Sequence, residues 1–217
     1  MLKLKSLLFI FLFCWGALPA LAESPPPPLR VLMMVNEGFW APEYYLPRQA
    51  FDRAGFRVTV AAKAAGLVNP DKRNTDVAPV EAELGFEQVN PGDYDAIAFA
   101  GGNGAWTDYF PNDRVHELLA AFLGSGKPTG LLCSSTGLLG VARNYNGQGK
   151  PLAAGRHVTG YYRVEGLLRE LGKVNYDGGD PKLPYVVIDG NLITGRDPMS
   201  AQMFGDTMVR VLKQLPR

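Results

Sequence analysis

Short apolar runs alternate with segments in which apolar residues recur every three or four positions along most of this chain. A short apolar run is typical of a buried strand, and the wider spacing is typical of an amphipathic helix. The runs predict strands at residues 30–35, 56–61, 95–100, 127–133, 157–159, 185–188 and 192–194. The spaced segments predict helices at residues 42–54, 112–123, 135–142 and 200–215. Strands that alternate with helices predict an α/β fold, with a single doubly wound, mainly parallel sheet and helices on both faces.

One long segment follows neither pattern. Residues 62–90 lack a clean period and are rich in Asp, Asn and Pro, so we expect an excursion with one short helix near residues 80–84. Residues 23–28 (ESPPPP) predict a short extended tether. We find no internal repeat and no domain linker after Pro28. We therefore expect residues 29–217 to form one flavodoxin-like domain.

The N-terminal segment has the pattern of an export signal. Lys3 and Lys5 precede an almost uninterrupted apolar run at residues 7–18, and residues 20–22 (ALA) supply the small residues that a signal peptidase recognises. The run is shorter than the ~20 residues that a membrane-spanning helix needs. We therefore expect residues 1–22 to be removed and the mature protein to be periplasmic, without contact with the membrane.

Composition narrows the classes of partner. The chain has 22 basic and 21 acidic side chains, and loss of Lys3 and Lys5 with the signal leaves 20 against 21, a net charge of −1. A nearly neutral protein offers no basic field to nucleic acid, so we expect a small-molecule partner. Cleavage also removes Cys14, which leaves Cys133 as the single cysteine and excludes an intramolecular disulfide. Two histidines offer little for a zinc site, and we expect neither a metal nor an organic cofactor.

The candidate chemistry lies in the loops that follow strands, because ligands bind at the carboxyl ends of the strands in such sheets. Three places qualify, namely residues 36–43, residues 101–105 and the junction at Cys133. Cys133 is followed by Ser-Ser-Thr-Gly and has the form of a nucleophile elbow, where a helix N-terminus would lower the pKa of the thiol. The alternative is that Cys133 is a small buried hydrophobic residue.

Two further features surround this cysteine. The backbone N–H groups of Gly101, Gly102 and Ser134 would form an oxyanion hole. Aromatic residues come from the same loops, and the set is Phe39, Trp40, Tyr44, Tyr45, Trp106, Tyr109 and Phe110, with Tyr161 and Tyr162 as further candidates. These rings would either pack in the core or a dimer interface, or line a pocket for a small organic ligand. Trp40 and Trp106 are the candidates for the pocket wall.

Four motifs resemble those of one family. They are residues 100–105 (AGGNGA), 126–128 (GKP) ahead of Cys133, 155–161 (GRHVTGY) and 189–195 (DGNLITG). In this order they resemble the ThiJ/PfpI superfamily, the class I glutamine amidotransferase-like fold, and the last two are most similar to its glyoxalase III/chaperone branch. The resemblance implies that Cys133 is the elbow cysteine and Glu43 the acid beside it, and members commonly form homodimers. Judged on its surroundings in the sequence alone, Glu43 is a first-turn glutamate favoured by the helix dipole.

The chain departs from that family at two positions. The resemblance implies histidine directly after the cysteine, and often after the two glycines, where this chain has Ser134 and Asn103. Of its own histidines, we interpret His116 as a solvated helix residue, and His157 as a pocket residue only where the fold bends it there. A cysteine without its base loses the proton transfer on which general acid–base catalysis depends.

Two hypotheses follow. In the first, an exported, cofactor-independent lyase or hydratase of the glyoxalase III type adds the Cys133 thiolate to a small carbonyl compound, and Glu43 moves the proton. In the second, the protein is a redox-sensing, chaperone or ligand-binding relative whose cysteine meets an oxidant without a catalytic partner. Retention of Cys133 and Glu43 favours a functional sulfur, and the absence of histidine at both family positions favours the second hypothesis. The sequence leaves both open.

Overall fold

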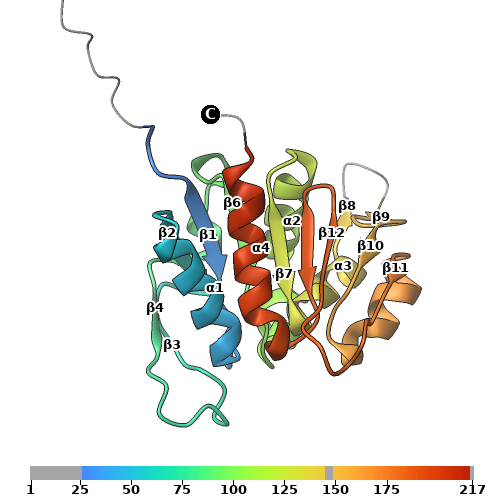
Figure 1. Ribbon diagram of the computed structural model, residues 1–217, viewed down its shortest axis with the longest axis horizontal. Coiled ribbons are helices and arrows are strands. Elements are labelled where there is room, and N and C mark those ends of the chain that lie inside the picture. The colour runs from blue at the N-terminus through green and yellow to red at the C-terminus, as the bar shows by residue number, and fades with distance from the viewer. Residues whose placement is uncertain (1–25, 145–148, 216–217) are drawn as a thin grey trace, which may run out of the picture.

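The computed structural model describes residues 26–144 and 149–215, and its centre is a seven-stranded sheet (Figure 1). In order across the sheet, the strands are β12 (Val186–Asp189), β13 (Leu192–Gly195), β7 (Thr129–Leu132), β6 (Ala96–Phe99), β1 (Arg30–Met34), β2 (Arg57–Ala62) and β5 (Leu84–Gly85). Neighbouring strands are parallel except at one edge, where β12 runs antiparallel to β13. The predicted α/β fold with a mainly parallel sheet is confirmed.

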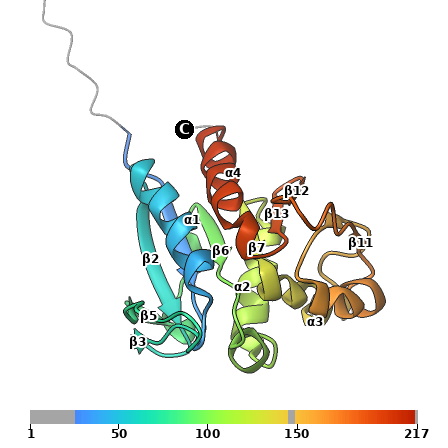
Figure 2. The same ribbon diagram turned by 60° about the horizontal axis from the view of Figure 1, so that its bottom comes forward.

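Helices cover both faces of this sheet (Figure 2). The helices α1 (Ala41–Arg53) and α4 (Ala201–Lys213) pack together on one face, and α2 (Asp113–Gly124) and the short α3 (Leu138–Val141) lie on the other. Because both faces are covered, β6 and β7 are buried along their whole length, and their sequences are apolar rather than alternating.

The first helix follows from local signals. Pro42 lies in the first turn of α1, where its missing N–H removes no helical hydrogen bond. Gly55 follows the helix with a φ of +76°, a conformation that glycine adopts without a steric penalty. The same first turn carries Glu43, so the position of this carboxyl is set by where α1 begins.

The prediction for residues 62–90 was wrong in one respect. The expected helix near residues 80–84 is replaced by strand: β4 (Val80–Ala82) pairs antiparallel with β3 (Gly66–Val68), and β5 joins the sheet beside β2. Burial alternates along β4, with an exposed glutamate between two buried residues, which is the period of a strand. Three residues are too few for that period to be distinguished from a helical one in the sequence.

The remaining elements are short. A second antiparallel pair joins β8 (Arg143–Asn144) to β9 (Lys150–Pro151), and a parallel pair joins β10 (His157–Val158) to β11 (Asn175–Tyr176). The 3₁₀ turns are Phe86–Gln88, Pro91–Asp93, Cys133–Gly137, Tyr162–Val164 and Pro198–Ser200, and the π turns are Ala105–Tyr109 and Leu167–Leu171. The helix predicted at residues 135–142 is therefore one 3₁₀ segment followed by the single turn of α3.

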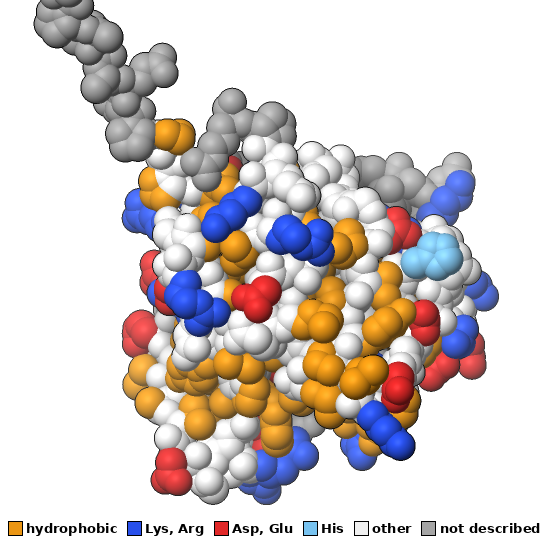
Figure 3. Space-filling view, viewed as in Figure 1, with side chains coloured by type: hydrophobic (Ala, Val, Ile, Leu, Met, Phe, Trp, Pro, Cys, Tyr) orange, Lys and Arg blue, Asp and Glu red, His pale blue; other side chains and the backbone are white. Residues whose placement is uncertain are grey.

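The expected signal peptide, residues 1–22, lies outside the described residues. Within residues 26–144 and 149–215, none of the helices has the length and apolar character required to cross a bilayer. On the face covered by α1 and α4, hydrophobic side chains gather in the lower half of the view (Figure 3). Exposed large hydrophobic side chains of the protein include Leu183, Ile188, Met199 and Met203.

Candidate functional site

The loops after β1, β6 and β7 meet where these parallel strands end. Phe39, in the loop after β1, makes β-bridges with Pro70 and with Gly102. The backbone N–H of Trp40 donates a hydrogen bond to the carbonyl of Gly101 over 3.3 Å. The three places that the strand order predicted are therefore adjacent in space.

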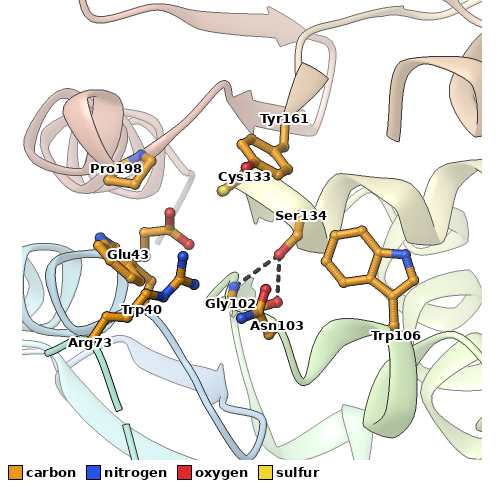
Figure 4. Close-up of a pocket in the computed structure, with 10 residues that line it drawn as sticks. All are labelled: Trp40, Glu43, Arg73, Gly102, Asn103, Trp106, Cys133, Ser134, Tyr161 and Pro198. Atoms are coloured by element: carbon orange, nitrogen blue, oxygen red, sulfur yellow. Dashed lines mark hydrogen bonds between the residues drawn. The ribbon is translucent and has the colours of Figure 1, made fainter. Parts of the chain in front are cut away.

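A cavity of about 200 Å³ lies between these loops (Figure 4). It is lined by Trp40, Glu43, Arg73, Gly102, Asn103, Trp106, Cys133, Ser134, Tyr161 and Pro198. The volume is below the ~300–1,000 Å³ typical of sites for drug-sized molecules. The cavity therefore suits a ligand of a few non-hydrogen atoms.

Cys133 occupies the sharp turn between β7 and the 3₁₀ segment Cys133–Gly137. Its φ is +59°, in the left-handed region that residues other than glycine seldom adopt. The side chain is buried beside the cavity, and this burial raises the pKa of the thiol well above its usual value, with the carboxyl of Glu43 as the next cause. The lowered pKa that we expected is therefore wrong. The helical segment beside the sulfur is too short for its dipole to offset the cost of burying a thiolate.

Glu43 projects from the first turn of α1 into the floor of the cavity, and it is fully buried. The thiol of Cys133 and the backbone N–H of Gly101 face its carboxyl. Within the described part of the chain, neither carboxyl oxygen has a hydrogen-bond partner of good geometry. Burial raises the pKa of Glu43 to about 8. At neutral pH, a protonated carboxyl therefore faces a protonated thiol, and the pair carries no charge.

Gly101 allows the carboxyl and the thiol to approach each other, and Gly102 allows the loop after β1 to pack closely against it. A Cβ at Gly101 would collide with Oε2 of Glu43, and it would lie 2.9 Å from Cβ of Cys133 and 2.7 Å from the carbonyl oxygen of Leu132. Gly102 has a φ of +123°, and a Cβ there would meet the backbone of the loop after β1. The contribution of Gly101 to the site is therefore steric.

Ser134 links the turn at Cys133 to the loop of Gly101 and Gly102 through hydrogen bonds. Its Oγ accepts a hydrogen bond from the N–H of Gly102 over 2.9 Å and donates one to the carbonyl of Gly102 over 2.8 Å. The Gly102 N–H is thus already occupied, and the Gly101 N–H faces Glu43, which corrects the oxyanion hole that we predicted. The N–H of Ser134 faces the sulfur of Cys133 and is the member of that set that remains available.

The rim of the cavity contains an ion pair that the sequence did not reveal. Arg73 donates from Nε and Nη2 to the carboxylate of Asp71 over 2.8 Å and 2.9 Å. Asn103 Nδ2 donates to the same carboxylate over 2.7 Å, and the Arg73 guanidinium lies over the ring of Trp40, 4.8 Å from its centroid. The hydrogen bonds from Arg73 lower the pKa of Asp71 to about 2. Both charged residues come from the aperiodic segment, where no motif or period marked them.

The predicted aromatic set divides between the pocket and the core. Trp40 and Trp106 line the cavity, together with Tyr161. Phe39 and Tyr109 are fully buried in the core instead. Each of the two interpretations therefore applies to different members of the set. Pro198, which precedes α4 and completes the wall, carried no signal in the sequence.

The structure does not bring either histidine to the pocket. His157 is exposed at the start of β10, and its N–H donates to the carboxylate of Asp189 over 2.7 Å, because β10 pairs with β11 away from the elbow. His116 is buried in α2 rather than solvated, and burial lowers its pKa. In the two described ranges, His, Cys, Asp and Glu side chains form no group of three or more that could hold a metal ion.

The sequence and the structure were compared with those of known proteins. The chain is 27% identical over 188 residues to a deglycase of Pyrococcus abyssi, which covers 85% of this chain and 100% of that protein. It is 26% identical over 185 residues to protein/nucleic acid deglycase 2 of Escherichia coli, covering 84% and 97% of the two chains. The crystal structure of glyoxalase III from Candida albicans has the same fold, with a TM-score of 0.70 at 18% identity and coverage of 84% and 96%. The pattern of the DJ-1/PfpI family matches residues 29–211, and the chain therefore belongs to that family, as its motifs indicated.

Proposed function

We propose that the protein converts small reactive aldehydes through an adduct at Cys133, as a glyoxalase that needs no cofactor. The observation that carries this proposal is the buried, protonated carboxyl of Glu43, which faces the Cys133 thiol at the floor of a small cavity. A proton donor and a nucleophile at one site are the groups that addition to a carbonyl requires. The two relatives named deglycases support the same kind of chemistry.

In the first step, the thiol of Cys133 adds across the C=O bond of the aldehyde. The sulfur bonds to the carbonyl carbon, its proton passes to one oxygen of Glu43, and the proton on the other Glu43 oxygen passes to the carbonyl oxygen. The product is a hemithioacetal, and Glu43 is neutral again. No charge remains in a site where burial makes charge costly. The N–H of Ser134 stabilises the oxygen while charge develops on it.

With a 2-oxoaldehyde such as methylglyoxal, an internal redox step follows. Glu43 accepts the proton of the sulfur-bearing carbon at one oxygen and gives its own proton to the adjacent carbonyl oxygen, which yields an enediol. It then accepts the hydroxyl proton of the first carbon and returns a proton to the second carbon, so the first carbon is oxidised to a thioester and the second is reduced to an alcohol. Water then cleaves the thioester, giving a 2-hydroxy acid and the free thiol. Because Ser134 occupies the position after the cysteine and no histidine lines the cavity, we expect this hydrolysis to be the slowest step.

The test uses methylglyoxal with the mature protein and with Cys133→Ser, Glu43→Gln and the control Glu117→Gln. Glu117 is exposed on α2 and does not line the cavity. We expect the parent and the control to form lactate, Cys133→Ser to form none, and Glu43→Gln to be slower by about 10²–10⁴-fold. The intact mass of the parent should also increase by one methylglyoxal, bound at Cys133. Unimpaired turnover by Cys133→Ser or Glu43→Gln would contradict the proposal.

A second candidate function is redox sensing. It is favoured by the absence of a histidine from the cavity lining and by the carboxyl of Glu43, which faces the sulfur. Peroxide would oxidise the sulfur to a sulfinate, which would accept a hydrogen bond from the protonated carboxyl of Glu43. This function predicts no methylglyoxal adduct, and it predicts a sulfinate that forms in the parent and fails to persist in Glu43→Gln, as followed by mass spectrometry.

We also propose that the protein acts in the periplasm. The basic start, the apolar run and the small residues at 20–22 support export followed by cleavage. Sequencing the N-terminus of the protein from a periplasmic fraction should begin at Glu23. Recovery of the chain in the cytosol with Met1 in place would contradict export.

A further inference from the structure

Arg73 brings the one formal charge to the described cavity lining. The other titratable lining residues are Glu43, Cys133 and Tyr161. Glu43 is neutral at pH 7 because burial raises its pKa to about 8, and the thiol and the phenol, whose ordinary pKa values already lie above 7, are neutral as well. In Figure 4, the guanidinium of Arg73 points into the open centre of the cavity, on the side opposite Trp106. A bound ligand therefore meets a neutral floor and, on one wall, the guanidinium of the Arg73–Asp71 ion pair.

The guanidinium of Arg73 is held in place by contacts that do not use all of its N–H groups. Asp71 engages Nε and Nη2, and the ring of Trp40 supports one face of the group. Within residues 26–144 and 149–215, Nη1 donates to no acceptor of good geometry. Asn103 donates a hydrogen bond to Asp71 and fixes its carboxylate. The guanidinium of Arg73 is therefore already ordered before a ligand binds. A carboxylate accepts hydrogen bonds and matches the planar donors of a guanidinium.

A second cation, Arg163, lies near enough to Arg73 for the two charges to interact. Arg163 donates from Nε to the hydroxyl of Tyr162 over 3.0 Å, beside Tyr161 in the cavity wall. This hydrogen bond raises the pKa of Arg163, whereas the charge of Arg73 acts in the opposite direction, so the two cations repel each other. An anion bound at Arg73 would relieve part of that repulsion. The nearby carboxylate of Asp197 is occupied by Arg196 Nε over 2.9 Å and does not compensate the pair.

We infer that the cavity selects a small aldehyde that carries a carboxylate group, and that Arg73 holds this carboxylate. The inference rests on the proposed function, because it takes the aldehyde carbon as the site of attack by Cys133. The addition is the same balanced step: the S–H adds across C=O, Glu43 relays the proton to oxygen, and no oxidant is consumed. A cavity of about 200 Å³ accommodates an aldehyde one or two carbons away from its carboxylate.

Glyoxylate and methylglyoxal form a matched pair of probes. Both place an aldehyde next to a trigonal carbon and have the same number of non-hydrogen atoms, but only glyoxylate is charged. Each is titrated against the rate at which a maleimide alkylates Cys133, in the parent, Arg73→Gln and the control Arg48→Gln. Arg48 forms an ion pair of 2.9 Å with Asp52 and does not line the cavity.

We expect Arg73→Gln to weaken protection by glyoxylate about ten-fold or more, since hydrogen bonds to a charged group are lost. Protection by methylglyoxal should stay within about two-fold, as should both probes in Arg48→Gln. If Arg73→Gln weakens the protection of Cys133 equally for the two aldehydes, or for neither, the inference is overturned.

A separate measurement isolates the carboxylate site from the thiol chemistry. Oxamate carries the same carboxylate as glyoxylate, but an amide carbon that does not accept a thiol replaces the aldehyde. Its binding to the Cys133→Ser variant is followed by tryptophan fluorescence. We expect a change that reports the two lining tryptophans, Trp40 and Trp106, and that disappears in Cys133→Ser/Arg73→Gln. If neither aldehyde protects Cys133 while oxamate still binds through Arg73, the proposed function fails and the carboxylate site stands. Oxamate binding that is indifferent to Arg73 overturns the site.

Discussion

The floor and the rim of the cavity are built by different means. Cys133 and Glu43 in the floor are buried, and their positions follow from the end of a central strand and the start of a packed helix. Arg73 in the rim comes from the connection between β3 and β4, and its side chain is 59% exposed. A change in the floor therefore disturbs backbone geometry and buried protons, whereas a change in the rim alters charge and leaves the core intact. The reactivity and the selectivity that we propose thus depend on separate parts of the molecule.

Among changes in the cavity floor, we expect Gly101→Ala to have the largest effect on turnover. The new Cβ would collide with Glu43 Oε2 and press on the Leu132 carbonyl. We expect methylglyoxal turnover to fall by about 10²-fold or more, because the acid is displaced from the thiol. Stability should fall by about 1–3 kcal/mol in urea unfolding, as for other overpacked sites. The matched control is Gly124→Ala, where a Cβ meets nothing within 4 Å, and an equal effect of the two changes would contradict the steric role.

The protonation of the floor sets the pH dependence of the reaction. Since Glu43 must be protonated to deliver its proton, adduct formation at Cys133 should decrease as pH rises through about 8. Above that pH the decline should approach about ten-fold per pH unit, as stopped-flow measurements of thiol consumption would show. A rate that increases across this range would indicate attack by a free thiolate and would remove Glu43 as the acid.

The same carboxyl makes the stability of the fold depend on pH. Its pKa is raised from 4.5 to about 8, so between these values the folded state binds more protons than the unfolded state. The contribution is therefore fully present below about 4.5 and is lost as pH rises through about 8. We expect the free energy of unfolding to decline by at most about 1.4 kcal/mol per pH unit in that window. Glu43→Gln should flatten the decline, and an unchanged slope would show that the carboxyl is not buried in solution.

The rim should give the smallest effect on the fold. Arg73→Gln removes the exposed partner of an ion pair with the buried Asp71, which keeps its hydrogen bond from Asn103 and can accept one from the new amide. We expect urea unfolding to change by less than about 1 kcal/mol and the methylglyoxal adduct to form as before. A larger loss of stability would mean that Arg73 anchors the β3–β4 connection and that floor and rim are not independent.

The sequence predicted the parts of the site that depend on strand ends. Apolar runs located the central strands, and the rule that ligands bind at their carboxyl ends led to Cys133 and to the Gly101–Gly102 loop. Glu43 was reached only through the family resemblance, because a first-turn glutamate has an ordinary local explanation. The direction of the Cys133 pKa shift was missed, since it depends on burial by residues distant in the sequence. Arg73 was missed because an exposed arginine in an aperiodic segment has no local signature until Asp71 and Asn103 are placed around it.

The two hydrogen bonds between Ser134 and Gly102 bear on any attempt to add a general base to this site. A histidine at position 134 would supply the imidazole that the cavity lacks, but it would also remove the hydroxyl that bridges the donor and the acceptor of one glycine. The freed glycine peptide would need new partners or water before the imidazole could be of use. A useful histidine at position 134 would therefore require a compensating change in the glycine loop, because the single substitution first destabilises that loop.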